Sequence, residues 1–200
     1  MIFRQWGQRM KGIDCGNEAA AWFEKVINKK GVRLLRHIPG LDFRPSFTVK
    51  GDKYLKTNEF PVIYHYSCAC LLINHNSIRD LNKRLPERES VSYVNFRPNI
   101  VVEGEPYAED EWGMLRIGEL QLKKLKECER CVVTTIKPES GVTASEPLKT
   151  LKKYRIAKTK DAKTAFGNQP LFGMTYGVKA EGLISLSDCL YVTQTSQRIV

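Results

Sequence analysis

Two cysteines spaced C-x-x-C offer the most specific chemistry in this sequence. Cys128 and Cys131 lie in the run KECERCVVTTI, and Arg130 stands beside the second thiol. One thiolate could be the ligand of a soft metal, and a neighbouring guanidinium favours the anionic form of sulfur. On spacing alone, however, two small cysteines buried in the core are the first interpretation.

Zinc binding and disulfide exchange are the other two interpretations of this motif. A structural zinc site needs a second pair of ligands, and the available residues do not form one of the usual pairs. These residues are His65, Cys68, Cys70 and His75. A redox pair is expected at the start of a helix, whereas the β-branched residues 131–136 predict a strand. Zinc is therefore unsupported and disulfide exchange is disfavoured.

The sequence Arg97-Pro98-Asn99 separates two predicted strands, 92–96 and 99–104. Proline makes the turn rigid, and a guanidinium beside an amide suits a phosphate or a polar heterocycle. A purely structural turn is the simpler interpretation. The acidic residues 109–111 could bind a hard cation, but consecutive side chains diverge, so a solvated acidic loop is expected.

The elements that must position these residues are predicted to be mostly strands. Apolar residues at helical spacing predict three helices, over residues 17–30, 77–85 and 146–156. Alternating or β-branched runs predict short strands between them. Polar, aperiodic segments predict surface loops over residues 41–61 and 158–170. We therefore expect a strand-dominated, barrel-like α+β domain with about three helices.

Charge and composition limit the class of protein. The 200 residues contain 32 Lys and Arg against 22 Asp and Glu, a net charge of +10. Such a balance suits an acidic partner, a phosphate-bearing ligand, nucleic acid or an anionic membrane surface. Nucleic acid is disfavoured, because the basic run 121–163 lacks interleaved stacking aromatics. No apolar stretch approaches the roughly 20 residues of a membrane helix, and no targeting segment is recognised.

Several stretches in order resemble one family. They are GIDCGNEAAAW, NFRPNIVVEG, PYAEDEW, RIGELQLKKLKECERCVVTTIKPESG, EPLKTLKKYR and PLFG, spread from about Gly12 to Val192. Together they resemble the MOSC domain of the amidoxime-reducing component, a mitochondrial molybdenum enzyme. More distantly they resemble the C-terminal domain of molybdenum cofactor sulfurase. The resemblance implies a MOSC-type β-barrel that binds molybdenum through a pyranopterin (molybdopterin) and one cysteine thiolate.

The resemblance also implies roles for particular residues. Cys131 would be the metal ligand and the catalytic position, with Arg130 in contact with the cofactor. Arg97 and Asn99 would hold the pterin or its phosphate. Further implied cofactor contacts are Ser67, Cys68, Glu129 and Thr175. Glu129 departs from the family, which tends to have a small polar residue there, and it places an anion near an anionic cofactor.

The implied activity is reduction of N-hydroxylated compounds such as amidoximes and hydroxylamines, with the substrate oxygen leaving as water. Electrons would arrive through cytochrome b5 and its NADH-dependent reductase. Cytochrome b5 is acidic, so the charge of +10 favours its docking. The implied location is the mitochondrial outer membrane or the cytoplasm, with no membrane segment expected in this chain.

Residues 1–60 are predicted to be a remnant of the MOSC N-terminal region, with helix 17–30 and a long loop, and residues 61–200 the MOSC β-barrel domain. The family has a preceding β-rich segment that this sequence enters partway, so a truncated form is expected. The alternative function is therefore a noncatalytic MOSC domain that binds cofactor or carries sulfur. A sulfurase role would need a pyridoxal phosphate-binding, aminotransferase-like partner domain.

Overall fold

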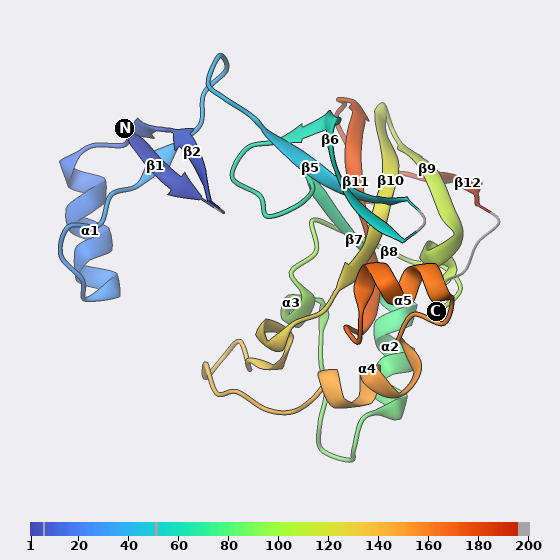
Figure 1. Cartoon of the computed structure of the whole chain (residues 1–200). Helices are drawn as coiled ribbons and strands as arrows, with labels where there is room; N and C mark the ends of the chain where they lie inside the picture. Colours follow the sequence, from blue (N-terminus) through green and yellow to red (C-terminus); the bar gives the residue numbers. More distant parts are fainter. Residues whose placement is uncertain (6, 51, 196–200) are drawn as a thin grey trace.

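The centre of the molecule is a curled sheet of six strands, which forms a half-barrel in the computed structural model (Figure 1). The structure describes residues 1–5, 7–50 and 52–195, so the last five residues of the predicted 61–200 domain lie outside it. The strand order is β12-β9-β10-β11-β7-β8, with β7 and β8 parallel and all other neighbours antiparallel. The strands are β7 (Cys70–Asn74), β8 (Ile100–Val102), β9 (Trp112–Ile117), β10 (Leu120–Glu129), β11 (Leu171–Ala180) and β12 (Leu190–Gln194).

The long strands β10 and β11 lie at the centre of the sheet. Leu122 of β10 and Met174 and Tyr176 of β11 are fully buried, and they pack with Leu72 and Trp112 from neighbouring strands. The pairing of β10 with β11 is irregular, with shifts between Lys124 and Lys126 and again before Glu129. Irregular pairing of this kind bends a strand and redirects its side chains, and here it alters the end of β10 that leads to Cys131.

Four helices cover the lower end of the sheet in Figure 1, and a fifth lies in the N-terminal part. The four are α2 (His75–Arg84), α3 (Tyr93–Phe96), α4 (Leu148–Tyr154) and α5 (Lys160–Phe166). The apolar residues of α2, α3 and α4 pack on the sheet through Ile73 and Phe172, and those of α5 pack on Leu171. Two 3₁₀ turns complete this end, η1 (Ala108–Glu111) and η2 (Val132–Thr135).

The N-terminal part contains α1 (Asn17–Ile27) and two short hairpins, and it lies to one side of the sheet (Figure 1). The hairpins pair β1 (Ile2–Gln5) with β2 (Gln8–Lys11) and β3 (Ile13–Asp14) with β4 (Leu35–Arg36). Tyr64 links this part to the rest of the chain. Its hydroxyl donates to the Lys11 carbonyl at 2.9 Å, and its own carbonyl accepts from Gln5 Nε2 at 2.7 Å.

The predicted loop over residues 41–61 is wrong. The segment forms a long hairpin of β5 (Arg44–Lys50) and β6 (Lys53–Val62). Most of β6 is exposed, so its sequence has no apolar alternation to mark a strand. The hairpin is anchored instead by side chains, since buried Arg44 donates to the carbonyls of Ile63 and His65.

The predicted number of helices is also wrong, because the described residues contain five α-helices where about three were expected. Residues 92–96, predicted as a strand, form α3, which begins with a capping box between Ser92 and Asn95. The predicted loop 158–170 contains α5, where the Thr159 side chain accepts from the Ala162 amide. In both segments a side chain that caps the N-terminus stabilises a helix that the spacing of apolar residues does not predict.

The fold class is confirmed: the molecule is a mixed α+β structure, rich in strands, around the curled half-barrel. Within the ranges that the structure describes, we find no helix with both the length and the apolar character needed to cross a membrane.

Candidate functional site

Cys131 lies two residues beyond the end of β10 and directly precedes η2 as its N-cap residue, and it is exposed. The two threonines that follow hold this turn. Thr134 donates to the Cys131 carbonyl from both its amide (3.2 Å) and its hydroxyl (3.0 Å), and Thr135 Oγ1 donates to the Val132 carbonyl at 2.7 Å. The predicted strand over 131–136 is therefore wrong, because threonine hydroxyls close a 3₁₀ turn there.

The interpretation of both cysteines as core residues is also wrong. Cys128 is half-buried and Cys131 is exposed. A thiol held on a fixed turn at the surface can reach a ligand or a metal, which a core thiol cannot. The second cysteine of the motif is thus the one placed for chemistry.

Arg130 is buried beside this thiol and joins three parts of the chain. Its Nε donates to the Phe172 carbonyl on β11 at 2.7 Å, and its Nη1 donates to the Phe96 carbonyl at the end of α3 at 3.2 Å. Its Nη2 is buried and has no hydrogen-bond partner among the described residues. Burial lowers the pKa of Arg130, while Cys128 and Cys131 act to raise it. An unsatisfied buried guanidinium nitrogen is costly and fits an acceptor supplied by a ligand.

The bond from Arg130 to Phe96 brings the Arg97-Pro98-Asn99 turn to the same end of the sheet as Cys131. Arg97 is exposed and takes a left-handed conformation, with φ of 56°, as the C-cap residue that directly follows α3. The Asn99 side-chain oxygen accepts from the Leu71 amide at 2.9 Å, so its amide nitrogen is the atom that can donate to a ligand. The turn is therefore structural and also presents a guanidinium to solvent.

Ser67, Cys68 and Thr175 form a second group of predicted residues. Ser67 Oγ lies 3.0 Å from Cys68 Sγ, and Thr175 Oγ1 donates to the Lys126 carbonyl at 2.7 Å. Burial raises the pKa of the Cys68 thiol, while hydrogen bonds from Ser67 and Thr175 and the charge of Lys126 act to lower it. The structure brings these residues together between β10, β11 and the start of β7.

Glu129 is held by two residues that sequence reasoning missed, Lys126 and Tyr54. Lys126 Nζ lies 2.5 Å from Glu129 Oε2, and the Tyr54 hydroxyl donates to Glu129 Oε1. Burial raises the pKa of Glu129 to about 7 and lowers the pKa of Lys126. Their contact opposes both shifts, because it favours the charged form of each group. The irregular pairing of β10 near Lys126 could not be read from the sequence, so no signal marked this lysine as internal.

The acidic run 109–111 is not the solvated loop that was predicted. Glu109 and Asp110 are both buried. Ser77 Oγ contacts both carboxylate oxygens of Glu109, at 2.8 and 3.0 Å, and Arg155 pairs with Asp110. These carboxylates hold α2 and the segment after α4 against η1, so they serve the fold.

The residues near Cys131 fit the kind of group predicted from the sequence. Across the described residues, no three His, Cys, Asp or Glu side chains are placed to hold a metal ion. The exposed Cys131 thiol fits a single ligand to a metal whose other ligands come from a nonprotein group. The unsatisfied Nη2 of Arg130 and the exposed guanidinium of Arg97 suit the anionic part of such a group.

Comparison with known proteins identifies the family of this chain. The MOSC domain family matches residues 59–191. The chain is 35% identical to mitochondrial amidoxime-reducing component 1 of Mus musculus over 191 residues and 37% identical to mitochondrial amidoxime reducing component 2 of Homo sapiens over 192 residues. Each alignment covers 94% of this chain and 54–55% of the relative, so the chain spans about half the length of these curated relatives. The match over most of the chain, including the whole six-stranded sheet apart from the end of β12, shows that the protein belongs to the MOSC domain family.

Proposed function

We propose that this protein binds a molybdenum–pyranopterin cofactor and reduces N-hydroxylated compounds such as amidoximes and hydroxylamines. The observation that carries the proposal is the exposed Cys131 thiol beside the buried, unsatisfied Nη2 of Arg130. Membership of the MOSC family and similarity to amidoxime-reducing components support it. The division of the chain at residues 60 and 61 stays a prediction.

In this proposal Cys131 is the thiolate ligand, Arg130 and Arg97 donate to anionic parts of the cofactor, and Asn99 donates from its amide nitrogen. Ser67, Cys68 and Thr175 line the neighbouring wall between β7, β10 and β11. When bound, the cofactor would supply a two-electron redox centre for cleavage of the N–O bond. The Thr134 and Thr135 contacts keep the turn fixed, so the Cys131 thiolate is oriented before any ligand binds.

Cleavage of each N–O bond needs two electrons and two protons and gives water together with an amine from a hydroxylamine or an amidine from an amidoxime. We propose cytochrome b5 and its NADH-dependent reductase as the source of electrons. The net charge of +10 favours docking of an acidic electron donor. The names of the relatives lead us to propose a mitochondrial location.

The proposal is tested by measuring molybdenum and released pterin in protein purified from a host that makes the cofactor. We expect stoichiometric molybdenum in the wild type and its loss in Cys131→Ala. Cys189→Ala is the matched control, because Cys189 is also exposed but lies in the segment before β12. Benzamidoxime reduction with cytochrome b5, its reductase and NADH should follow the molybdenum content.

Two outcomes would contradict the proposal. A folded wild type without molybdenum would instead favour a noncatalytic MOSC domain. Molybdenum that is retained in Cys131→Ala would remove the proposed ligand.

A further inference from the structure

Glu129 and Arg130 are neighbours in the sequence with opposite charges, and yet they do not pair with each other. Both carboxylate oxygens of Glu129 are engaged elsewhere, Oε1 by the Tyr54 hydroxyl and Oε2 by Lys126 Nζ. Arg130 uses Nε and Nη1 for backbone carbonyls and leaves Nη2 unsatisfied. Consecutive side chains along a strand point to opposite faces, and the contacts with Tyr54 and Lys126 fix the Glu129 carboxylate on its own side.

Lys126 is the charged partner of the Glu129 carboxylate. Only 2% of the Lys126 side chain is exposed, and its ammonium lies between the Glu129 carboxylate and the ring of Tyr54, 5.0 Å from the ring centre. A buried ammonium is stable only when it is paired. Lys126 therefore needs an anion in this interior, and Glu129 is the one it contacts most closely.

Tyr54 contributes from a different part of the chain. It lies on β6, whereas Lys126 and Glu129 lie on β10, so the contact connects the β5–β6 hairpin to the strand that leads to Cys131. The hydroxyl of Tyr54 occupies the carboxylate oxygen that Lys126 does not contact. Together the two residues satisfy both oxygens of Glu129.

The pairing of Glu129 with Lys126 affects the charge available near Cys131. Lys126 and Glu129 cancel each other, and Glu127 is paired with Lys124 at 3.0 Å. Among the described residues, Arg130 makes hydrogen bonds to backbone carbonyls alone, so its charge has no carboxylate partner at this end of β10. The Glu129 carboxylate and the Arg130 guanidinium are close enough for their charges to interact. If Lys126 were neutral, the Glu129 anion would therefore offset the charge of Arg130 and disfavour an anionic ligand.

We infer that Lys126 neutralises the Glu129 carboxylate and that Tyr54 helps to fix it in place, which keeps the Arg130 guanidinium available to an anionic ligand beside Cys131. Lys126 and Tyr54 are thus positioning residues that act through Glu129. The inference rests on the proposed function, because the anionic ligand is the pyranopterin cofactor. It also assigns a purpose to Lys126, which no motif indicated.

The test combines four variants: Lys126→Met, Glu129→Gln, the double variant of both, and Tyr54→Phe. For each we would measure molybdenum and released pterin per folded protein, together with the thermal midpoint of unfolding. We expect Lys126→Met to lose cofactor content by roughly tenfold, because an uncompensated anion is left beside Arg130. Content should return to near the wild-type level in the double variant, which no longer carries that anion.

Tyr54→Phe keeps the test informative if Lys126→Met does not fold. Tyr54 is exposed and the change removes only its hydroxyl, so the fold should be preserved while cofactor content falls by a smaller factor. Tyr191→Phe is the matched control, since Tyr191 is an exposed tyrosine on β12. Its cofactor content should equal that of the wild type.

The outcomes separate this inference from the proposed function. If the wild type contains molybdenum and Lys126→Met retains it, or if the double variant stays as low as Lys126→Met, the inference is overturned and the proposed function stands. If the wild type contains no molybdenum, the proposed function fails. The thermal midpoints then decide whether Lys126 and Glu129 are coupled: stability that Lys126→Met loses and the double variant regains supports the charge pairing, and additive losses overturn it.

Discussion

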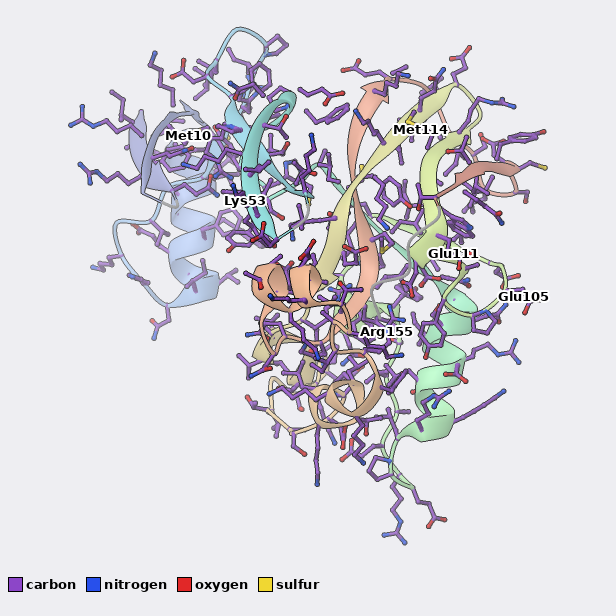
Figure 2. All side chains as sticks on the ribbon, turned by 45° about the vertical axis from the view of Figure 1, so that its right-hand side comes forward. Met10, Lys53, Glu105, Glu111, Met114 and Arg155 are labelled. Carbon is purple, nitrogen blue, oxygen red and sulfur yellow. The ribbon has the colours of Figure 1, made fainter. Side chains whose placement is uncertain are left out.

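Arg155 donates two hydrogen bonds to the Asp110 carboxylate, from Nη1 to Oδ2 at 2.7 Å and from Nη2 to Oδ1 at 2.9 Å, and both side chains are buried. Arg155 Nε also donates to the Leu171 carbonyl at 2.8 Å. Figure 2 labels Arg155 between the lower end of the sheet and α2. The pair thus joins η1, the end of α4 and the first residue of β11, the strand that neighbours the candidate site.

Breaking this pair should destabilise the fold strongly. Arg155→Met leaves the Asp110 carboxylate buried without a cation, and we expect the free energy of unfolding to fall by about 3 kcal/mol. Urea denaturation of the wild type and the variant measures the change. The double variant Arg155→Met with Asp110→Leu should lose less than Arg155→Met alone, because no charge is then left unpaired. Additive losses would contradict this interpretation.

Glu109 should make stability depend on pH. Burial is the main cause that raises the pKa of Glu109 above its ordinary value of 4.5, and the neighbouring Asp110 adds to it. Folding therefore favours the protonated carboxyl. The stabilisation is complete below the pKa of the unfolded chain and is lost as the pH rises through the folded pKa.

We therefore expect the free energy of unfolding of the wild type to fall, relative to that of Glu109→Gln, as the pH rises above 4.5. The amide of glutamine can still accept from Ser77 Oγ, so the variant should fold. Denaturation curves at a series of pH values measure the difference. A difference that stays constant with pH would contradict the role of Glu109.

The sheet could be predicted from the sequence where one face of a strand is buried. The run around β9 and β10 alternates, since Leu115, Ile117 and Leu122 are buried between more exposed neighbours, and it was predicted as strand. The β5–β6 hairpin could not be predicted in this way, because residues 53–59 are almost wholly exposed. Its partners are backbone groups and distant side chains, which leave no periodic signal.

The candidate site was only partly predictable for a similar reason. Cys131, Arg130 and Arg97 were marked by their chemistry and by the resemblance of their motifs. Lys126 and Tyr54 were not, because 72 residues separate them and the packing of the β5–β6 hairpin against β10 brings them together at Glu129. The irregular β10 pairing places Lys126 inside, and local sequence cannot specify it.

Gly173 on β11 should tolerate no side chain. Its φ is +80°, and an added Cβ would lie 2.7 Å from Ile73 Cγ1, 2.9 Å from the Leu72 carbonyl oxygen and 3.1 Å from Arg130 Nη2. We expect Gly173→Ala to lower the free energy of unfolding by about 3 kcal/mol, from backbone strain and overpacking together. Gly141→Ala is the control: φ is +69° there but nothing lies within 4 Å, so about 1 kcal/mol is expected. Equal losses in the two variants would show that packing around Arg130 is loose.

If the proposed electron donor is correct, its reaction with this protein should depend on salt and on the lysines of α4. Lys152 and Lys153 are exposed on α4, which packs against the η2 turn that follows Cys131. Electrostatic steering weakens as ions screen the charges, so the second-order rate of oxidation of reduced cytochrome b5 should fall by about tenfold or more between low and high ionic strength.

Reversing Lys152 and Lys153 to Glu should lower this rate at low salt. Reversing Lys29 and Lys30, which are exposed after α1, changes the net charge by the same amount at another place. Stopped-flow measurements on both double variants therefore separate a local docking surface from overall charge. Equal rates for the two double variants would exclude docking at α4. A slower reaction in the α4 variant alone would place the donor close to Cys131.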